Sequence, residues 1–394
     1  MQILLVGYLF FTLVRMLYQI ATGFLYVAPS TRRSHRGYRP LVSVIIPAWN
    51  EEVGVLKTIK SAMANTYQNL EIIVVDDGST DSTRRRVQRY KRRFDRDGTL
   101  IRLISQDNAG KAAALNTGIA TAAGELIITL DADSYLTPDS IQELVKAMAN
   151  TDYAVAIGEI VVGNTGSLLG QIQHYEYLMS FHLKRAQHIF NSAYIFPGAL
   201  TAFRSSILKE TGSFAGYSST EDLDISMRIK AKGYQVAYVD RAMCITEGAT
   251  SLRGLLNQRI RWRHGFIACS LRRREFAWST KKGRYLSFVD YPLAIIGIIE
   301  LLLYPFILAL LLEQLIFHLA VPILILSYSL LVFVLLLLSG LRNEAKIPPK
   351  KALLMPVALS AIAVLEYIAL LVSLYRILMQ KETAWTVWRR TGAS

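Results

Sequence analysis

Cysteine is scarce in this sequence: its 394 residues include only Cys244 and Cys269. Two cysteines cannot make a disulfide framework, and two alone make a poor zinc site. We therefore expect both thiols to be reduced and to face the cytosol or lipid. The sequence also lacks a collagen-like or heptad repeat, a Walker motif, and a GxGxxG after its first predicted strand. These absences exclude fibrous folds and argue against the two commonest glycine-rich nucleotide sites.

Acidic residues are fewer than basic ones, with 30 Asp and Glu against 44 Lys and Arg and a formal net charge of +14. Hydrophobic residues nevertheless make up 52% of the chain, and charged residues only 19%. This composition excludes a disordered chain. Apolar residues and positive charge must therefore be concentrated in different segments.

Apolar segments lie at both ends of the sequence. Residues 3–28 are almost uncharged apart from Arg15, are long enough to span a bilayer, and lack the features of a cleaved signal peptide. Similar segments occur at 293–312, 319–339 and about 353–372. The arginines that follow the first segment favour the cytoplasm. We therefore expect an integral, multi-pass membrane protein whose middle domain is cytoplasmic.

The predicted topology leaves one conflict open at the C-terminal tail. Four crossings with a cytoplasmic middle domain place both termini outside, yet the tail is basic, which favours the inside. Its basic residues are Arg376, Lys381, Arg389 and Arg390. Either one apolar segment lies along the membrane interface or the tail is an exception to the charge rule.

The middle of the chain, about residues 41–250, alternates short β-branched segments with helical patterns. The predicted strands are 41–47, 71–75, 100–104 and 125–130, and the predicted helices between them are 51–64, 81–94 and 109–122. This alternation predicts an α/β domain with a mostly parallel sheet and helices on both faces. Such sheets bind ligands beyond the carboxyl ends of their strands.

Polar clusters follow three of these strands: Asn50 with Glu51, Asp76 with Asp77, and Asp131 with Asp133. A single cluster is often only a turn or a helix cap, as Asp81 or Ser79 would be. Three clusters at adjacent strand ends instead favour a ligand site. Asp131 and Asp133 leave their strand in the same direction, which suits Mg²⁺ or Mn²⁺ with substrate phosphate as a further ligand.

Two other features could serve such a site. Lys111 opens the predicted helix 109–122, whose N-terminus favours anions. Glu221 and Asp222 precede a predicted helix at 223–232. Asp222 is therefore either a helix cap or a general base.

Residues 253–284 form a basic segment with interleaved apolar residues, in which Glu275 is the one acid. This pattern suits the anionic face of a membrane. Nucleic acid is the usual alternative partner of such a segment. The neighbouring apolar segments favour lipid, and a nucleic-acid-binding protein would not account for the carboxylates.

Seven motifs lie between about Val42 and Trp262, in the order PAWNEE, VVDDGSTD, NAGKAAALNTG, DAD, PGALTAFR, TEDLD and QRIRW. In this order they resemble the membrane-embedded branch of glycosyltransferase family 2, which includes cellulose, hyaluronan, chitin-oligosaccharide and poly-N-acetylglucosamine synthases. The resemblance covers more than half of the chain. It implies a Rossmann-like GT-A fold, a UDP-sugar donor and inversion at the anomeric carbon.

The resemblance also implies roles for individual residues. Those implied to bind the donor are Pro47, Asn50, Glu51, Asp76, Asp77, Lys111, Asp131 and Arg261. Asp77 is favoured for the uracil, Arg261 for the diphosphate, and Asp133 over Asp131 as the direct metal ligand. The implied catalytic residues are Asp222, as the base, and Glu221. The implied acceptor residues are Gln258, Gly198 and Trp262, the last stacking on the acceptor sugar.

The expected division of the chain is a membrane helix at 1–30, a GT-A domain at 41–250, amphipathic helices at 251–288, membrane helices at 289–378 and a basic tail at 379–394. Poly-N-acetylglucosamine synthases resemble this layout most. The expected partners are a UDP-sugar, a polysaccharide or glycolipid acceptor and membrane lipids, with room for accessory export subunits and no nucleic acid.

Several alternatives stay open. The motifs also fit addition of a single sugar to a membrane lipid, whereas the intact DAD, TED and QRIRW argue against an inactive scaffold. Glu300 and Glu366 fall inside predicted membrane segments. They either pair locally and hold helices together or line a path for a departing sugar chain.

Overall fold

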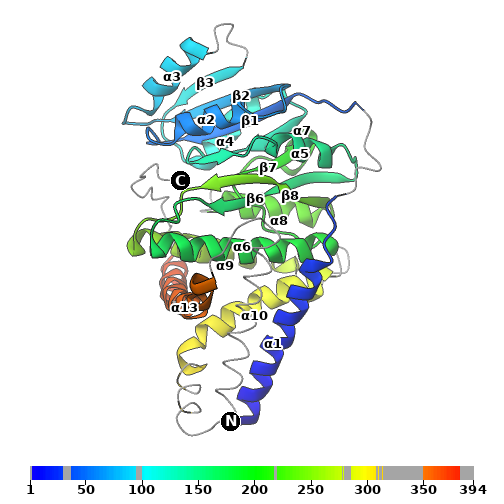
Figure 1. Ribbon diagram of the computed structural model, residues 1–394, viewed down its shortest axis with the longest axis vertical. Coiled ribbons are helices and arrows are strands. Elements are labelled where there is room, and N and C mark those ends of the chain that lie inside the picture. Colours follow the sequence, from blue (N-terminus) through cyan, green and yellow to red (C-terminus); the bar gives the residue numbers. More distant parts are fainter. Residues whose placement is uncertain are drawn as a thin grey trace.

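An eight-stranded mixed sheet forms the centre of the protein (Figure 1), with strand order β3-β2-β1-β4-β7-β6-β8-β5. The computed structural model describes residues 2–29, 37–94, 100–216, 220–276, 278, 285–307, 309, 313 and 349–381. Its core consists mainly of aliphatic side chains from the central strands and from the helices packed on them. The strand ends that this sheet brings together define the site described below.

The first half of the sheet is parallel. Its strands are β1 (Val42–Ala48), β2 (Leu70–Asp77), β3 (Ile101–Gln106) and β4 (Leu126–Thr129), and its helices are α2 (Val55–Met63), α3 (Thr83–Phe94) and α4 (Lys111–Thr121). Every residue of β1 and β2 is buried, as expected for Val- and Ile-rich strands in a parallel sheet covered on both faces. The predicted strands and helices of this half are therefore confirmed.

The second half of the sheet is mixed. Its strands are β5 (Ser134–Leu136), β6 (Tyr153–Val162), β7 (Thr201–Arg204) and β8 (Gln235–Thr246), with helices α5 (Ser140–Met148), α6 (Leu168–Ile189), α7 (Ser205–Thr211) and α8 (Glu221–Ala231). Strand β7 runs antiparallel to both β4 and β6, and β5 runs antiparallel to β8. The prediction of a mostly parallel sheet is thus correct only for the first half. The residue pattern of a strand does not encode the direction in which the strand runs. That direction depends on which end of the sheet the preceding connection reaches.

A further group of helices lies at one end of the molecule, below α6 in Figure 1. They are α1 (Gln2–Phe24), α9 (Leu252–Arg272), α10 (Tyr291–Leu302) and α13 (Pro349–Leu378), with a 3₁₀ turn at Arg274–Phe276 and a π-helical turn at Leu286–Asp290. Helix α1 packs on α6, and α13 packs on α9, α10 and α6.

Within the described ranges, no helix combines the length and the apolarity that crossing a membrane requires. The apolar segments predicted at 3–28, 293–312 and 353–372 overlap α1, α10 and α13, respectively. The segment predicted at 319–339 and the tail beyond residue 381 lie outside the described residues.

Both acidic residues of the apolar segments are paired between helices. Arg15 Nη2 of α1 lies 3.2 Å from Glu300 Oε2 of α10. Glu366 of α13 pairs with Arg259 and Arg263 of α9, at 3.3 and 2.7 Å. These contacts agree with the alternative in which the carboxylates hold helices together.

Both cysteines are free and buried, with Cys244 in β8 and Cys269 on α9. The expectation of free thiols is confirmed. The expectation that they face the cytosol or lipid is wrong, because Cys244 lies within the sheet core and Cys269 lies in a smaller apolar cluster. Helix α9 also carries a buried cation, Arg259, and packs on α8 and α13. Much of the predicted surface segment at 253–284 is therefore covered by protein.

Candidate active site

Four charged side chains meet at the carboxyl end of β4. Lys111 Nζ, at the start of α4, lies 2.6 Å from Asp131 Oδ1 and 3.4 Å from Glu221 Oε1. Glu221 and Asp222 form the first turn of α8. The sheet thus brings together three of the motifs found in the sequence, NAGK, DAD and TED, although 111 and 222 are far apart along the chain.

Gly198 forms one wall of this cluster. A Cβ atom placed on Gly198 would lie 3.3 Å from both Asp222 Oδ2 and Lys111 Nζ, and 3.8 Å from Asp131 Oδ2. The preceding backbone is held in place, because Phe196 N donates to Ser226 Oγ at 3.0 Å. Glycine therefore keeps this approach to the carboxylates open.

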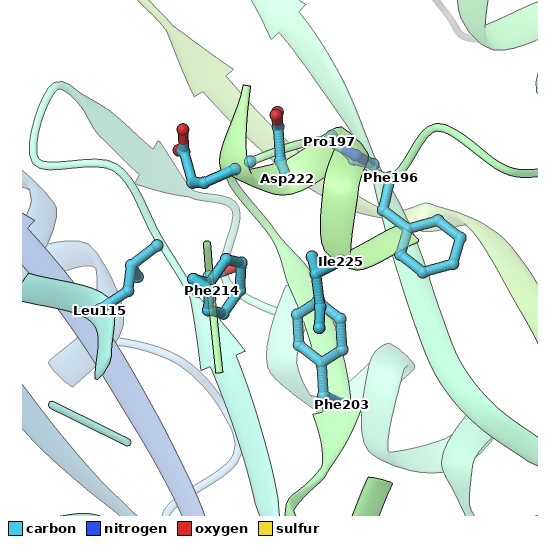
Figure 2. A pocket seen from close by; sticks show the side chains of 10 residues that line it. Leu115, Phe196, Pro197, Phe203, Phe214, Asp222 and Ile225 are labelled. Atoms are coloured by element: carbon cyan, nitrogen blue, oxygen red, sulfur yellow. The ribbon is translucent and has the colours of Figure 1, made fainter. Parts of the chain in front are cut away.

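Asp222 stands on an apolar layer (Figure 2). A cavity of about 10 Å³ lies beside it and has room for about one water molecule. The carboxylates of Glu221 and Asp222 line this cavity together with apolar side chains. The apolar side chains of this layer are Leu115, Phe196, Phe203, Phe214 and Ile225. Below Asp222 in this view are the rings of Phe203 and Phe214.

Burial, and after it the neighbouring Glu221, raise the pKa of Asp222 to about 6. Lys111 and Arg261 act in the opposite direction, as does the Leu223 N–H, which donates to Asp222 Oδ1 at 2.9 Å. Burial would lower the pKa of Lys111, but Asp131, Glu221 and Asp222 together raise it, so Lys111 stays cationic. Asp222 is therefore a carboxylate near neutral pH that can accept a proton.

The two aspartates that end β2 differ in what they contact. Asp77 accepts hydrogen bonds from the Gln106 side chain at 2.7 Å and from the Ala109 and Gly110 N–H groups at 3.0 and 2.9 Å. It thereby fixes the loop that leads to Lys111. Asp76 Oδ1 is buried and has no hydrogen-bond partner among the residues described here. Asp77 is thus engaged with the protein through its carboxylate, and the prediction that it contacts the uracil stays a prediction.

The loop after β1 is built around Asn50, which has a left-handed φ of 55°. Asn50 Oδ1 accepts from Thr80 N at 2.9 Å, and Asn50 N donates to Ser79 Oγ at 3.0 Å. Asp81 accepts from Thr83 N at 2.9 Å at the start of α3. The interpretation of Ser79 and Asp81 as turn and cap residues is confirmed, and Asn50 joins them in this framework.

Two other residues that were predicted to bind the sugar-nucleotide donor lie near these loops. Glu51 is buried, and its N–H donates to Thr83 Oγ1 at 2.8 Å. Pro47 lies in β1 opposite Val75 of β2. Both belong to the protein layer that supports the strand ends.

Asp131 and Asp133 follow β4, as predicted for metal ligands. Asp131 Oδ1 is paired with Lys111, and Asp133 Oδ1 accepts from Ser134 Oγ at 2.9 Å. Over the described part of the chain, no group of three or more His, Cys, Asp or Glu side chains is arranged to hold a metal ion. The donor set therefore fits a hard cation only if a ligand such as a diphosphate supplies further oxygens, which is common for Mg²⁺.

The predicted acceptor residues lie on α9. Gln258 is buried, and its Oε1 lacks a hydrogen-bond partner within the described ranges. Trp262 is half-buried, and its ring centroid lies 6.4 Å from that of Tyr177 on α6. Arg261 is near enough to lower the pKa of Asp222. The QRIRW motif therefore adjoins the cluster that contains the TED motif.

Two residues near this site, both on α6, were not predicted from the sequence. Lys184 on α6 is buried and donates to Ile195 O at 2.6 Å, three residues before Gly198. Burial lowers the pKa of Lys184 to about 8, against the opposing effect of the Asp222 carboxylate. Tyr177 is the other, and its pKa is raised to about 12 by burial. Neither residue belongs to a recognisable motif. Only the packing of α6 in the folded chain shows that they lie near the site.

Comparisons with known proteins agree with this geometry. The family described as Glycosyl transferase family 2 matches residues 43–212. The poly-beta-1,6-N-acetyl-D-glucosamine synthase of Staphylococcus epidermidis is 31% identical over 249 residues, which are 62% of this chain and 58% of the relative. The synthase of the same name from Staphylococcus aureus strain COL is 29% identical over 268 residues, 67% and 64% of the two chains. The chain thus spans less than two thirds of these curated relatives.

A solved structure extends the likeness beyond the matched domain. A mannosyltransferase of Pyrobaculum calidifontis, in complex with GDP-Man and Mn²⁺, has a TM-score of 0.62 and 21% identity, and the match covers 96% of this chain and 98% of that one. At this identity the likeness establishes the fold alone. It confirms the predicted α/β fold of GT-A type as a mixed sheet.

Proposed function

We propose that the chain transfers N-acetylglucosamine from a UDP-sugar to a growing β-linked polysaccharide. The match of residues 43–212 to Glycosyl transferase family 2 supports the reaction type. The observation that carries this proposal is Asp222, a half-buried carboxylate with a raised pKa beside Lys111 and the open wall at Gly198. The choice of sugar is supported by the similarity to the two staphylococcal poly-beta-1,6-N-acetyl-D-glucosamine synthases.

In the proposed reaction, Asp222 accepts the proton of an acceptor hydroxyl. The hydroxyl oxygen forms a bond to the anomeric carbon, and the bond from that carbon to the diphosphate breaks with its electron pair on the departing oxygen. Attack opposite the leaving group inverts the configuration, so an α-linked donor gives a β-linked product. No covalent enzyme intermediate is required.

Positive charge near Asp222 suits the leaving diphosphate. Lys111 and Arg261 both lie close enough to lower the pKa of Asp222, and preorganised cations stabilise charge that develops on a leaving group. A divalent cation held by Asp133 and Asp131 would add Lewis-acid stabilisation of the same charge. The Mn²⁺ in the Pyrobaculum calidifontis mannosyltransferase supports such an ion here.

The proposed location is a membrane, with the sheet domain in the cytoplasm. Large apolar side chains are exposed on α1, α10 and α13, among them Phe10, Ile299 and Leu378 at 64%, 51% and 80%. Lipid would cover these surfaces, and export of the polymer, with or without accessory subunits, would start at this end. Carbonate extraction of membranes from expressing cells tests the location, since release into the supernatant would contradict it.

A panel of sugar nucleotides tests the function. Purified protein in detergent is incubated with UDP-N-acetylglucosamine, UDP-glucose, UDP-glucuronate or GDP-mannose, and both nucleotide release and product size are measured. The proposal expects release of UDP from UDP-N-acetylglucosamine with products of many sugars. Mass spectra showing one sugar on a lipid would instead support the alternative, a single-addition lipid transferase, and release from none of the donors would refute both.

A further inference from the structure

The indole of Trp262 is covered on one face by a guanidinium group. Arg259 Cζ lies 4.4 Å from the centroid of the Trp262 ring, one helical turn away on α9. A cation over an aromatic face is attracted by the ring quadrupole, and the attraction increases when the pair is shielded from water. The arginine side chain here is only 3% exposed. This contact therefore fixes the orientation of the ring and occupies one of its faces.

Arg259 is in turn held by carboxylates from two other helices. Its Nη2 lies 2.6 Å from Glu176 Oε2 of α6, and its Nε lies 3.3 Å from Glu366 Oε1 of α13. The other oxygen of Glu366 accepts from Arg263 Nε at 2.7 Å. We call Glu176, Arg259 and Glu366 the Arg259 tether. It joins residues up to 190 positions apart along the chain.

The Arg259 tether is not explained by its contribution to the free energy of folding alone. Removing two carboxylates and a guanidinium from water costs free energy that the ion pairs only partly offset. Its geometry has a further consequence, because α6 also carries Tyr177, whose ring adjoins Trp262 at 6.4 Å. Helix α6 thus holds the guanidinium, through Glu176, and also supplies the second aromatic ring that borders Trp262.

We propose that the Arg259 tether positions the Trp262 indole for the acceptor sugar, so that α13 controls how well the acceptor is engaged. This inference rests on the proposed function, in which Trp262 faces the acceptor. With Arg259 on one face of the ring, a sugar stacks on the other face. Arg259 and Glu366 are positioning residues in this arrangement, since neither contacts the reacting atoms.

The test compares Glu366→Gln and Arg259→Lys with a matched control, Glu300→Gln. Glutamine keeps the shape of Glu366 but removes its charge, and lysine keeps the charge of Arg259 but loses the fork that holds two carboxylates. The control removes the same charge from another arginine pair between helices, Arg15 with Glu300, which includes no residue of α9. Binding of UDP, measured by calorimetry, confirms that each variant is folded.

Two readouts separate the tether from the proposed function. The first is the fluorine NMR resonance of Trp262 in protein labelled with 5-fluorotryptophan, assigned by its loss in Trp262→Phe. It requires no activity. The second is the Michaelis constant for a β-1,6-linked N-acetylglucosamine pentamer at saturating UDP-N-acetylglucosamine. Absence of turnover in the parent would refute the proposed function, while the fluorine resonance still tests the tether.

The expected result is a shifted Trp262 resonance in both tether variants. The acceptor KM should rise on the order of tenfold, the scale of a desolvated cation–π contact, with the donor KM unchanged. Glu300→Gln should alter neither quantity. An unmoved resonance in both tether variants, a shifted resonance without a change in acceptor KM, or an equal effect in Glu300→Gln would each overturn the proposal.

Discussion

Lys111 Nζ lies 2.6 Å from Asp131 Oδ1, and this ion pair joins the first turn of α4 to the end of β4. The same ammonium group lies 3.4 Å from Glu221 Oε1 and close enough to Asp222 to lower its pKa. One cation therefore balances three carboxylates in a partly buried cluster. Any change at Lys111 should alter the protonation of the proposed base as well as the local charge.

Replacing Lys111 by glutamine should make activity more sensitive to acid. Without the ammonium group the pKa of Asp222 rises further, so the base becomes protonated at a higher pH. We expect the acidic limb of the kcat/KM profile to move to higher pH, with a loss of roughly tenfold at about pH 6.5 and a smaller loss at about pH 8.5. Lys146→Gln is the control, because Lys146 is an exposed lysine of α5 that pairs with Glu143. An unshifted acidic limb would contradict this electrostatic coupling.

Replacing Asp222 by asparagine should abolish transfer and spare UDP binding. Asparagine keeps the shape but cannot accept the proton, and the loss of a general base costs on the order of 10²–10⁴ in rate. In the parent, the base is ionised above its pKa of about 6, so activity should fall as the pH drops through that value. Turnover and UDP binding are measured by UDP release and calorimetry.

Asp224→Asn provides the matched control for Asp222. Asp224 lies on the same helix and pairs with Arg228 at 2.8 Å. Its loss should lower the free energy of unfolding by ~1–3 kcal/mol, because the buried pair is broken, but should leave turnover per folded molecule nearly unchanged. Near-parental turnover in Asp222→Asn would remove Asp222 from the role of base.

Replacing Gly198 by alanine should reduce transfer with little effect on stability. The new Cβ would lie 3.3 Å from both Asp222 Oδ2 and Lys111 Nζ, a tight contact that forces the charged groups to move. Displacements of a few tenths of an ångström at reacting groups should cost on the order of tenfold in kcat. Gly166→Ala is the control, since its Cβ would meet nothing within 4 Å. Equal rates in the two variants would show that the Gly198 wall is not needed.

Removing the divalent cation should stop the reaction and weaken UDP binding. If Asp133 holds the ion, Asp133→Ala should weaken UDP binding in the presence of Mg²⁺ or Mn²⁺ and change it little after EDTA treatment. Calorimetry of UDP binding under both conditions gives this comparison for parent and variant. Binding by Asp133→Ala that equals that of the parent in the presence of metal would assign the ion to other ligands.

Much of the first half of the fold could be predicted from local sequence. Strands such as 41–47 are continuous Val and Ile segments, and the helices between them begin after turn-forming residues, so each element has its own signal. The strand-end clusters were predictable for the same reason, because parallel strands place their carboxyl ends at one edge. The order of the seven motifs then carried the resemblance to glycosyltransferase family 2.

The remaining features depend on contacts between distant segments. The pairing of Arg259 with Glu176 and Glu366 joins three helices, and no spacing in the sequence marks it. The basic segment around Arg259 therefore suggested a membrane surface, although the arginine is buried. Asp77 was favoured over Asp76 on the resemblance, whereas the hydrogen bonds that Asp77 makes to the loop before Lys111 appear only in the folded chain.

The sequence by itself determined which residues are candidates for the chemistry. The DAD residues follow a strand and the TED residues open a helix, and both patterns are local, whereas QRIRW was singled out by the resemblance. The tertiary structure alone decided how those residues act on one another. Desolvation of Asp222 over Phe203 and Phe214, the shared ammonium group of Lys111 and the antiparallel entry of β7 all depend on packing between segments far apart in the chain. The local sequence pattern indicates which face of a helix or strand is apolar. Only the assembled core determines which charged groups are removed from water.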